Sequence, residues 1–333
     1  MRTMRFERPP YILGACSVGG PKESAGDIKD FIDIKLREDT FGEKTYEKAE
    51  KKMLYTAIDG AIRDAEKTVK DINAIIAGDL LDQIISATFS ARNFDTGYFG
   101  VYNACATFTE ALTLGATLVD GGYMDSVVCG TSSHFSSAER QYRYPLELGC
   151  TRPPQAQWTV TGAGACVIGR KSDERDGDGV RITGATVGKV VDYGVSDVNN
   201  MGAAMAPAAA DTICTHFKET GGSPEDYDLI VSGDLGALGS RILKDLTWEK
   251  GYDINANHVD CGELVYHIAE SEYQGGSGAG CSSMVFCSYL LKRLKERKFR
   301  KILLITTGAL LSSLSSMQGE SIPGIAHAVS IEA

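Results

Sequence analysis

The stretch that decides the fold runs from Cys105 to Thr131 and reads CATFTEALTLGATLVDGGYMDSVVCGT. It aligns without a gap on the stretch from Cys281 to Thr307, which reads CSSMVFCSYLLKRLKERKFRKILLITT. In both copies a turn of small residues that holds a cysteine precedes a helix pattern, a short polar turn and a hydrophobic strand. The match indicates that one structural unit occurs twice in the chain.

Two further pairs of segments match in the same order. Residues 12–18 (ILGACSV) resemble residues 182–187 (ITGATV), with a glycine at the same place in each. Residues 71–80 (DINAIIAGDL) resemble residues 226–235 (DYDLIVSGDL), and both end in Gly-Asp-Leu. Because the three matches keep their order, we expect two halves of similar topology.

Hydrophobic patterning in the first half predicts alternating strands and helices. Strands are predicted at 11–18, 74–77, 126–129 and 160–168, and helices at 44–69 and 103–119. This alternation is typical of a layered α/β fold. A polar linker at 170–179 is expected to separate an N-terminal half, 1–170, from a C-terminal half, 178–333.

Composition and charge exclude several classes of protein. Hydrophobic residues make up 43% and charged residues 23% of the 333 residues, which excludes a disordered or fibrous chain. A net charge of −10 without a Lys/Arg cluster argues against a nucleic-acid partner. The most apolar stretch, 302–314, is interrupted by polar residues, and the nine cysteines show no Cys-x-x-Cys spacing. We expect a soluble intracellular chain with mostly buried thiols, no cofactor and no bound metal.

Two segments carry a resemblance to the thiolase and β-ketoacyl-synthase superfamily. Residues 102–108 (YNACATF) resemble the nucleophile turn of the ketoacyl-synthase-III branch, and residues 161–168 (TGAGACVI) resemble the glycine-rich strand that ends the first half. The resemblance implies an α/β/α/β/α sandwich of five layers with two duplicated halves. It also implies a homodimer that pairs through the strand leading to the nucleophile turn.

Other segments resemble a sporulation branch of this superfamily, found in endospore-forming bacteria. They are residues 18–23 (VGGPKE), 41–44 (FGEK), 77–81 (AGDLL), 199–207 (NNMGAAMAP) and 318–324 (QGESIPG). This resemblance implies a protein that binds dipicolinic acid (pyridine-2,6-dicarboxylate), as the free acid or its calcium chelate, for uptake into the developing spore. It further implies integral-membrane partners of the same sporulation system, through which the chain would be peripheral at the spore inner membrane.

The catalytic side chains of the superfamily are missing from their expected places. Cys105 stands where the family nucleophile stands, but Gly233 or Asp234 replaces the family histidine, and the turn at 273–280 lacks the family asparagine. Loss of one oxyanion donor costs about 10²–10³ in rate. We therefore expect a protein that has lost catalysis. An acyl-CoA condensing enzyme or thioesterase that uses Cys105 with a displaced partner such as His134, or a purely structural subunit, remains the alternative.

Five residues are the candidate ligand contacts. Cys105 would lie at the base of the ancestral acyl pocket, and His134 and Asp79 follow strands, where ligands collect in α/β sheets. Arg140 and Arg143, with the nearby Arg152, could bind carboxylates, and Tyr142 and Tyr144 could stack on a pyridine ring. The alternatives are a small buried residue at a tight turn for Cys105, a surface or capping role for His134, and a capping role for Asp79. For the arginines, the alternative is a solvated loop or a dimer contact. Asp79 would also repel a dianion unless it were protonated or bridged by calcium.

Overall fold

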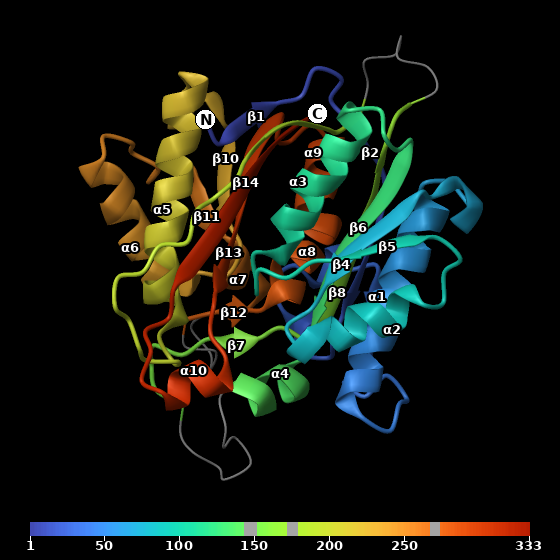
Figure 1. The fold of residues 1–333 in the computed structure, drawn as a ribbon, viewed down its shortest axis with the longest axis horizontal. Coiled ribbons are helices and arrows are strands. Elements are labelled where there is room, and N and C mark those ends of the chain that lie inside the picture. Colours follow the sequence, from blue (N-terminus) through green and yellow to red (C-terminus); the bar gives the residue numbers. More distant parts are fainter. Residues whose placement is uncertain (143–151, 172–178, 267–273) are drawn as a thin grey trace.

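The computed structural model describes residues 1–142, 152–171, 179–266 and 274–333 (Figure 1). Arg143, Tyr144 and most of the expected linker therefore lie outside the described residues. Within these ranges, ten strands of the main sheet divide into two halves of five. The first half has the order β5–β4–β6–β8–β2 and the second β11–β10–β13–β14–β9. In each half the first three strands are parallel, and each later strand runs antiparallel to the one before it.

The repeated sequence segments fall on equivalent strands of the two halves. The first half consists of β2 (Tyr11–Gly19), β4 (Ala74–Gly78), β5 (Gly97–Gly100), β6 (Ser126–Ser133) and β8 (Gly162–Gly169). The second half consists of β9 (Arg181–Thr186), β10 (Leu229–Ser232), β11 (His258–Asp260), β13 (Lys301–Ala309) and β14 (Gly324–Glu332). The three matched pairs correspond to β2 and β9, β4 and β10, and β6 and β13. The predicted duplication is confirmed.

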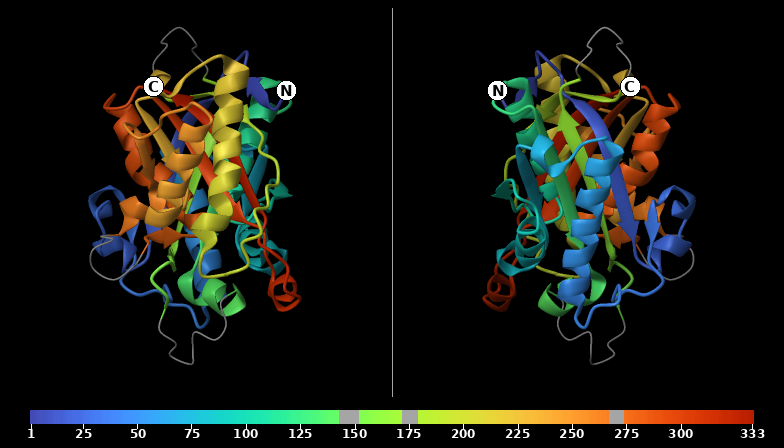
Figure 2. Two further views of the ribbon diagram at one scale, coloured as in Figure 1. Left: turned by 90° about the vertical axis from the view of Figure 1, so that its left-hand side faces the viewer. Right: turned by 90° about the vertical axis from the view of Figure 1, so that its right-hand side faces the viewer.

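Helices and sheets alternate in five layers, which can be followed from side to side in Figure 1. The middle layer contains α3 (Thr107–Asp120) and a continuous helical run made of α8 (Ala279–Val285), a π-helical turn and α9 (Leu291–Lys295). Helix α3 contacts both halves of the sheet. One outer layer contains α1 (Tyr46–Asp64) and α2 (Ile85–Ala91), and the other contains α5 (Met201–Thr220) and α6 (Gly236–Glu249) (Figure 2). The predicted α/β/α/β/α sandwich is confirmed.

Apart from the exposed edge strand β5, the strands of each half are largely buried on both faces, and the strand period of two divides their side chains between two cores. In β6, Val127 belongs to the central core and Val128 to the core under α1. In β13, Leu304 belongs to the central core and Leu303 to the core under α5. This double burial explains why these strands read as continuous hydrophobic runs.

Short elements complete the chain around these layers. They are β1 (Thr3–Arg5), β3 (Ile34–Lys35), β7 (Trp158–Thr159), β12 (Gly276–Ser277), α4 (Phe135–Tyr142), α7 (Cys261–Val265) and α10 (Ser313–Met317). Strand β1 pairs with β9, so the N-terminus of the first half is attached to the second half. Both chain ends lie at one end of the molecule, whereas α4 and α10 lie at the other (Figure 1). Among the described residues, no helix is long and apolar enough to cross a membrane.

Candidate functional site

Cys105 lies in a tight turn between β5 and α3. Ala104 adopts a left-handed conformation with φ 51°, and the Asn103 carbonyl accepts the N–H of Ala106 at 3.0 Å. Strand β13 packs directly on this turn at Gly308, where an added Cβ would lie 2.2 Å from the Asn103 carbonyl oxygen. Only glycine permits this approach, so the turn that presents Cys105 is held by both halves of the chain.

Cys105 lines a small pocket. The residue itself is only 7% exposed. The pocket has about 30 Å³ of free volume, enough for one or two water molecules. Its lining residues are Leu80, Tyr102, Ala104, Cys105, Ala138, Tyr142, Thr159, Met201, Ser277, Ala309 and Leu311. The pairing of β7 with β12 brings Thr159 and Ser277 side by side, one from each half.

Two tyrosines restrict the pocket. The Tyr142 hydroxyl donates a hydrogen bond to the Leu80 carbonyl and lies 3.2 Å from the Tyr102 hydroxyl. Burial raises the pKa of both phenols above the ordinary value, so both remain protonated at neutral pH. Neutral phenol groups can donate hydrogen bonds to a bound carboxylate if the pair separates.

Asp234, one of the two residues expected at the place of the family histidine, is a structural carboxylate. Asp234 is 1% exposed, and its carboxylate accepts hydrogen bonds from the Thr307 hydroxyl at 2.7 Å and from the Gly278 N–H at 3.0 Å. It therefore connects the end of β10 to β13 and to the start of α8. At the place of the family asparagine the pocket is lined by Ser277.

Asp79 lies at the end of β4, as predicted, but its side chain turns toward α2. Its carboxylate accepts the N–H groups of Leu81 at 2.8 Å and Ala87 at 2.7 Å. Burial raises the pKa of Asp79 to about 6. This geometry matches the helix-capping alternative, and Asp79 is not among the residues that line the Cys105 pocket.

His134 is fully buried at the end of β6. Its Nδ1 accepts the N–H of Ser136 at 3.1 Å, and its Nε2 lies 2.9 Å from the Asp39 carbonyl oxygen. An Nδ1 that accepts and an Nε2 that donates describe the neutral ring, and burial lowers the pKa of His134. The ring connects α4 to the segment before α1 and does not line the Cys105 pocket.

The two candidate arginines that the structure describes, Arg140 and Arg152, pair with carboxylates. Arg140 pairs with Glu47 at the surface, and Arg152 lies 2.8 Å from the buried carboxylate of Glu139. Neither lines the pocket, and Arg143 lies outside the described residues. Of the five candidate contacts, the structure places Cys105 in the pocket and directs Asp79, His134 and Arg140 elsewhere.

Several residues that line the pocket were not among the predicted ligand contacts, although some of them lie within sequence motifs. Met201 lies within the segment 199–207 that resembles the sporulation branch, and Tyr102 opens the nucleophile-turn motif. Ser277 lies in the glycine-rich turn at the place of the family asparagine. Thr159 and Leu311 carried no such signal, because their position depends on the β7–β12 pairing and on the path of the chain after β13.

Comparison with known proteins connects this fold to one protein family. The family model described as Stage V sporulation protein AD (SpoVAD) matches residues 1–332. Stage V sporulation protein AD of Bacillus subtilis (strain 168) is 42% identical over 331 residues, which cover 99% of this chain and 96% of that protein. This agrees with the resemblance to the sporulation branch found in the sequence.

Several solved structures share the fold at low sequence identity. They include 3-oxoacyl-[acyl-carrier-protein] synthase III from Aquifex aeolicus VF5, with a TM-score of 0.58 and 16% identity over 97% of this chain and 100% of that one. A Xanthomonas campestris OleA variant gives a TM-score of 0.66 and 14% identity over 99% and 98% of the two chains. Acetyl-CoA acetyltransferase of Bacillus anthracis gives 0.63 and 14% over the whole of both chains. These similarities establish the thiolase-like fold.

Proposed function

Because this chain belongs to the stage V sporulation protein AD family, we propose that it is a non-catalytic binding protein for dipicolinic acid in the forming spore. The Cys105 pocket is the binding site in this proposal. The identity of the ligand is inferred from the resemblance to the sporulation branch. The binding site is inferred from the pocket at Cys105.

One observation carries the non-catalytic part of the proposal. Among the described residues, Cys105, Tyr102 and Tyr142 are the titratable side chains in the lining of the pocket. A condensing enzyme needs a base and a thioester-oxygen donor beside the thiol. Asp234, near the expected position of the family histidine, already accepts hydrogen bonds from the Thr307 hydroxyl and the Gly278 N–H. No described side chain of the lining can take the proton that acyl transfer to Cys105 would release.

The charge of the lining favours the calcium chelate over the free acid. The lining residues include no Lys, Arg, Asp or Glu in the part of the chain that the structure describes. A dianion in such a pocket would lose its hydration without gaining a countercharge. Calcium dipicolinate is neutral, and the hydroxyl groups of Ser277 and the two tyrosines are suited to its outer carboxylate oxygens.

Ligand entry requires the pocket to expand. A pocket of about 30 Å³ is far smaller than a pyridine ring with two carboxylates. The side chain that must move is Tyr142, which lies at the last residue of α4 and is held by the Leu80 carbonyl. In this proposal the ligand replaces that hydrogen bond with one to its own carboxylate.

The proposal includes a homodimer and membrane-bound partners. Strand β5 pairs with β4 and ends the strand order of the described residues, and its Phe99 is 47% exposed. An edge strand with an exposed apolar side chain suits pairing with a second copy. Peripheral attachment at the spore inner membrane would come through the integral-membrane proteins of the same sporulation system.

The proposed function is tested by calorimetric titration of the purified protein with dipicolinate, with and without calcium, and with acetyl-CoA. Saturable heat from calcium dipicolinate, together with no acyl adduct on Cys105 by mass spectrometry, is the expected result. Silence with dipicolinate together with acylation of Cys105 and turnover of acetyl-CoA would reject the binding protein in favour of an enzyme. Silence with every compound would leave a structural subunit.

A further inference from the structure

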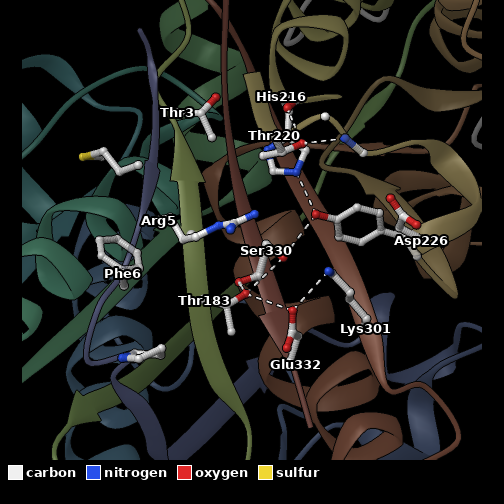
Figure 3. Close-up of a pocket in the computed structure, with 16 residues that line it drawn as sticks. Thr3, Arg5, Phe6, Thr183, His216, Thr220, Asp226, Lys301, Ser330 and Glu332 are labelled. Atoms are coloured by element: carbon white, nitrogen blue, oxygen red, sulfur yellow. Dashed lines mark hydrogen bonds and ion pairs between the residues drawn. The ribbon is translucent and has the colours of Figure 1, made fainter. Parts of the chain in front are cut away.

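A second and larger pocket lies at the end of the molecule that carries both chain termini, opposite α4 and α10 (Figure 1). Its volume is about 470 Å³, within the usual range of small-molecule sites. Strand β1 lies on one side of the pocket, β9, β14 and the start of β13 lie behind it, and the end of α5 with the segment up to Tyr227 lies on the other side (Figure 3). We name it the Arg5 pocket.

Two positively charged side chains line the Arg5 pocket, Arg5 and Lys301, and they differ in their ion pairing. The guanidinium of Arg5 extends from β1 across the pocket toward Ser330 (Figure 3). Among the described residues it has neither an ion pair nor a side-chain hydrogen bond. Lys301 lies 3.2 Å from the Glu332 carboxylate and 4.9 Å from the centroid of the Tyr227 ring. Arg5 is therefore the cation available to a ligand.

The two carboxylates of the lining are already engaged. Glu332 pairs with Lys301 and accepts a hydrogen bond from the Thr183 hydroxyl at 3.3 Å. Asp226 accepts the N–H of Ser223 at 2.8 Å, as part of the capping box of the short helix at 224–226. With two formal positive and two formal negative charges in the lining, the pocket suits a ligand with a single negative charge better than a dianion.

A chain of hydrogen bonds connects the buried Thr186 to Ser330 in the pocket lining. The Thr186 hydroxyl lies 2.8 Å from His216 Nδ1, and His216 Nε2 lies 2.7 Å from the Tyr227 hydroxyl. Tyr227 donates to Ser330 Oγ at 3.3 Å. Burial, with the positive charge of Lys301, lowers the pKa of His216 to about 4, so its ring is neutral. Ser330 Oγ accepts from Tyr227 and also from the Thr183 hydroxyl at 3.2 Å, so its own proton can be donated to a ligand in the pocket.

We propose that the Arg5 pocket binds a small monocarboxylate with a flat apolar body, at a site separate from the Cys105 pocket. The carboxylate pairs with the Arg5 guanidinium, whose planar fork fits two carboxylate oxygens, and accepts the Ser330 hydroxyl. The apolar body lies against Phe6 and Pro9, which line the pocket on the side of the N-terminal strand. The doubly charged dipicolinate is expected to bind here less tightly than a monocarboxylate.

Titration with benzoate as the probe, followed by NMR or calorimetry, tests this site. Wild-type protein should saturate, Arg5→Gln should weaken binding by about tenfold or more, and Glu332→Gln should strengthen it by releasing Lys301. Arg241→Gln, on the exposed side of α6, is the matched control and should leave binding unchanged. Absence of saturation up to about 10 mM benzoate, or equal binding by wild type and Arg5→Gln, would overturn the proposal.

Two further comparisons separate this site from the dipicolinate site. Benzoate binding should persist in Cys105→Trp. Its loss in that variant would place benzoate in the Cys105 pocket and reject the Arg5 pocket as its site. Inorganic phosphate should compete poorly, and competition as strong as that of a second carboxylate would reject the carboxylate class. Failure of benzoate to bind would leave calcium dipicolinate binding at Cys105 unaffected.

Discussion

The hydroxyl of Tyr142 lies 3.2 Å from the hydroxyl of Tyr102, across the mouth of the pocket that contains Cys105. Tyr102 precedes the nucleophile turn and Tyr142 ends α4, so the pair connects two segments that are distant in the chain. Because the Tyr142 hydroxyl also bonds the Leu80 carbonyl, three segments meet at one phenol. Tyr142 therefore holds two other segments of the pocket lining together.

Removal of that side chain should expose the thiol. We expect Tyr142→Ala to raise the rate of iodoacetamide labelling at Cys105 by about tenfold or more, since reactivity of a buried thiol is limited by access. Labelling is measured at Cys105 by peptide mass spectrometry. Tyr123→Ala, at a position 80% exposed and away from the pocket, is the control. An unchanged rate at Cys105 in Tyr142→Ala would show that this phenol does not close the pocket.

Asp234 should behave as a structural residue. Its replacement by alanine leaves the Gly278 N–H and the Thr307 hydroxyl buried without this acceptor, and we expect a loss of about 1–3 kcal/mol in the free energy of unfolding. Asp234→Asn keeps one acceptor oxygen and should lose less. Urea denaturation measures both. A stability equal to wild type in Asp234→Ala would contradict this role and reopen a functional one.

Glu50 gives the protein a defined dependence of stability on pH. It lies fully buried on α1, and its carboxyl oxygens accept the hydroxyl groups of Ser132 at 3.1 Å and Ser137 at 2.9 Å. Burial first, and then the negative charge of Asp79, raise the pKa of Glu50 well above its ordinary value. The folded state therefore keeps a proton that the unfolded state loses, so the free energy of unfolding falls as pH rises through this interval.

Glu50→Gln should remove this dependence. The free energy of unfolding of the variant relative to wild type should increase by up to about 1.4 kcal/mol per pH unit, from about pH 4.3 to the folded pKa of Glu50. The difference between the two proteins cancels the contributions of the buried histidines and thiols, which both share. Denaturation between pH 5 and 8 measures it, with the exposed Glu249→Gln as control. A difference that does not change with pH would contradict an elevated pKa.

The edge of β5 should hold the proposed dimer together. We expect Phe99→Asp to weaken self-association by about tenfold or more, because a charge would replace an apolar contact in the interface. Sedimentation velocity reports the mass in solution, and Tyr123→Asp on a separate exposed turn is the control. A monomeric wild-type protein, or a Phe99→Asp variant that dimerises as tightly as wild type, would reject this interface.

Most of the fold could be predicted from the sequence because its strands are buried on both faces. The run at 74–77 has no polar residue, and the helix predicted at 103–119 is found at Thr107–Asp120. The helix predicted at 44–69 was too long, since it ends at Asp64. The chain reverses at Glu66, which has φ 53°, and no glycine marks that position in the sequence.

The candidate site was predictable only in part. The motif around Cys105 located the turn, because a cysteine before a helix of small residues carries its own signal. Asp79 and His134 were correctly placed at strand ends, but sequence does not determine the direction of a side chain. Asp79 turns toward the N–H groups of α2, and His134 turns toward the Asp39 carbonyl. Those contacts depend on the packing of distant segments, which no local pattern describes.

The most direct test of the central claim is calorimetric titration of wild type and Cys105→Trp with calcium dipicolinate. The indole is larger than the free volume of about 30 Å³, so it would occupy the space that the ligand must open, and the variant should lose saturable binding. Circular dichroism checks that the variant remains folded. Asp245→Trp, at an exposed position of α6, should bind as wild type does. Equal binding by Cys105→Trp and wild type, or no binding by wild type, would contradict a dipicolinate site at Cys105.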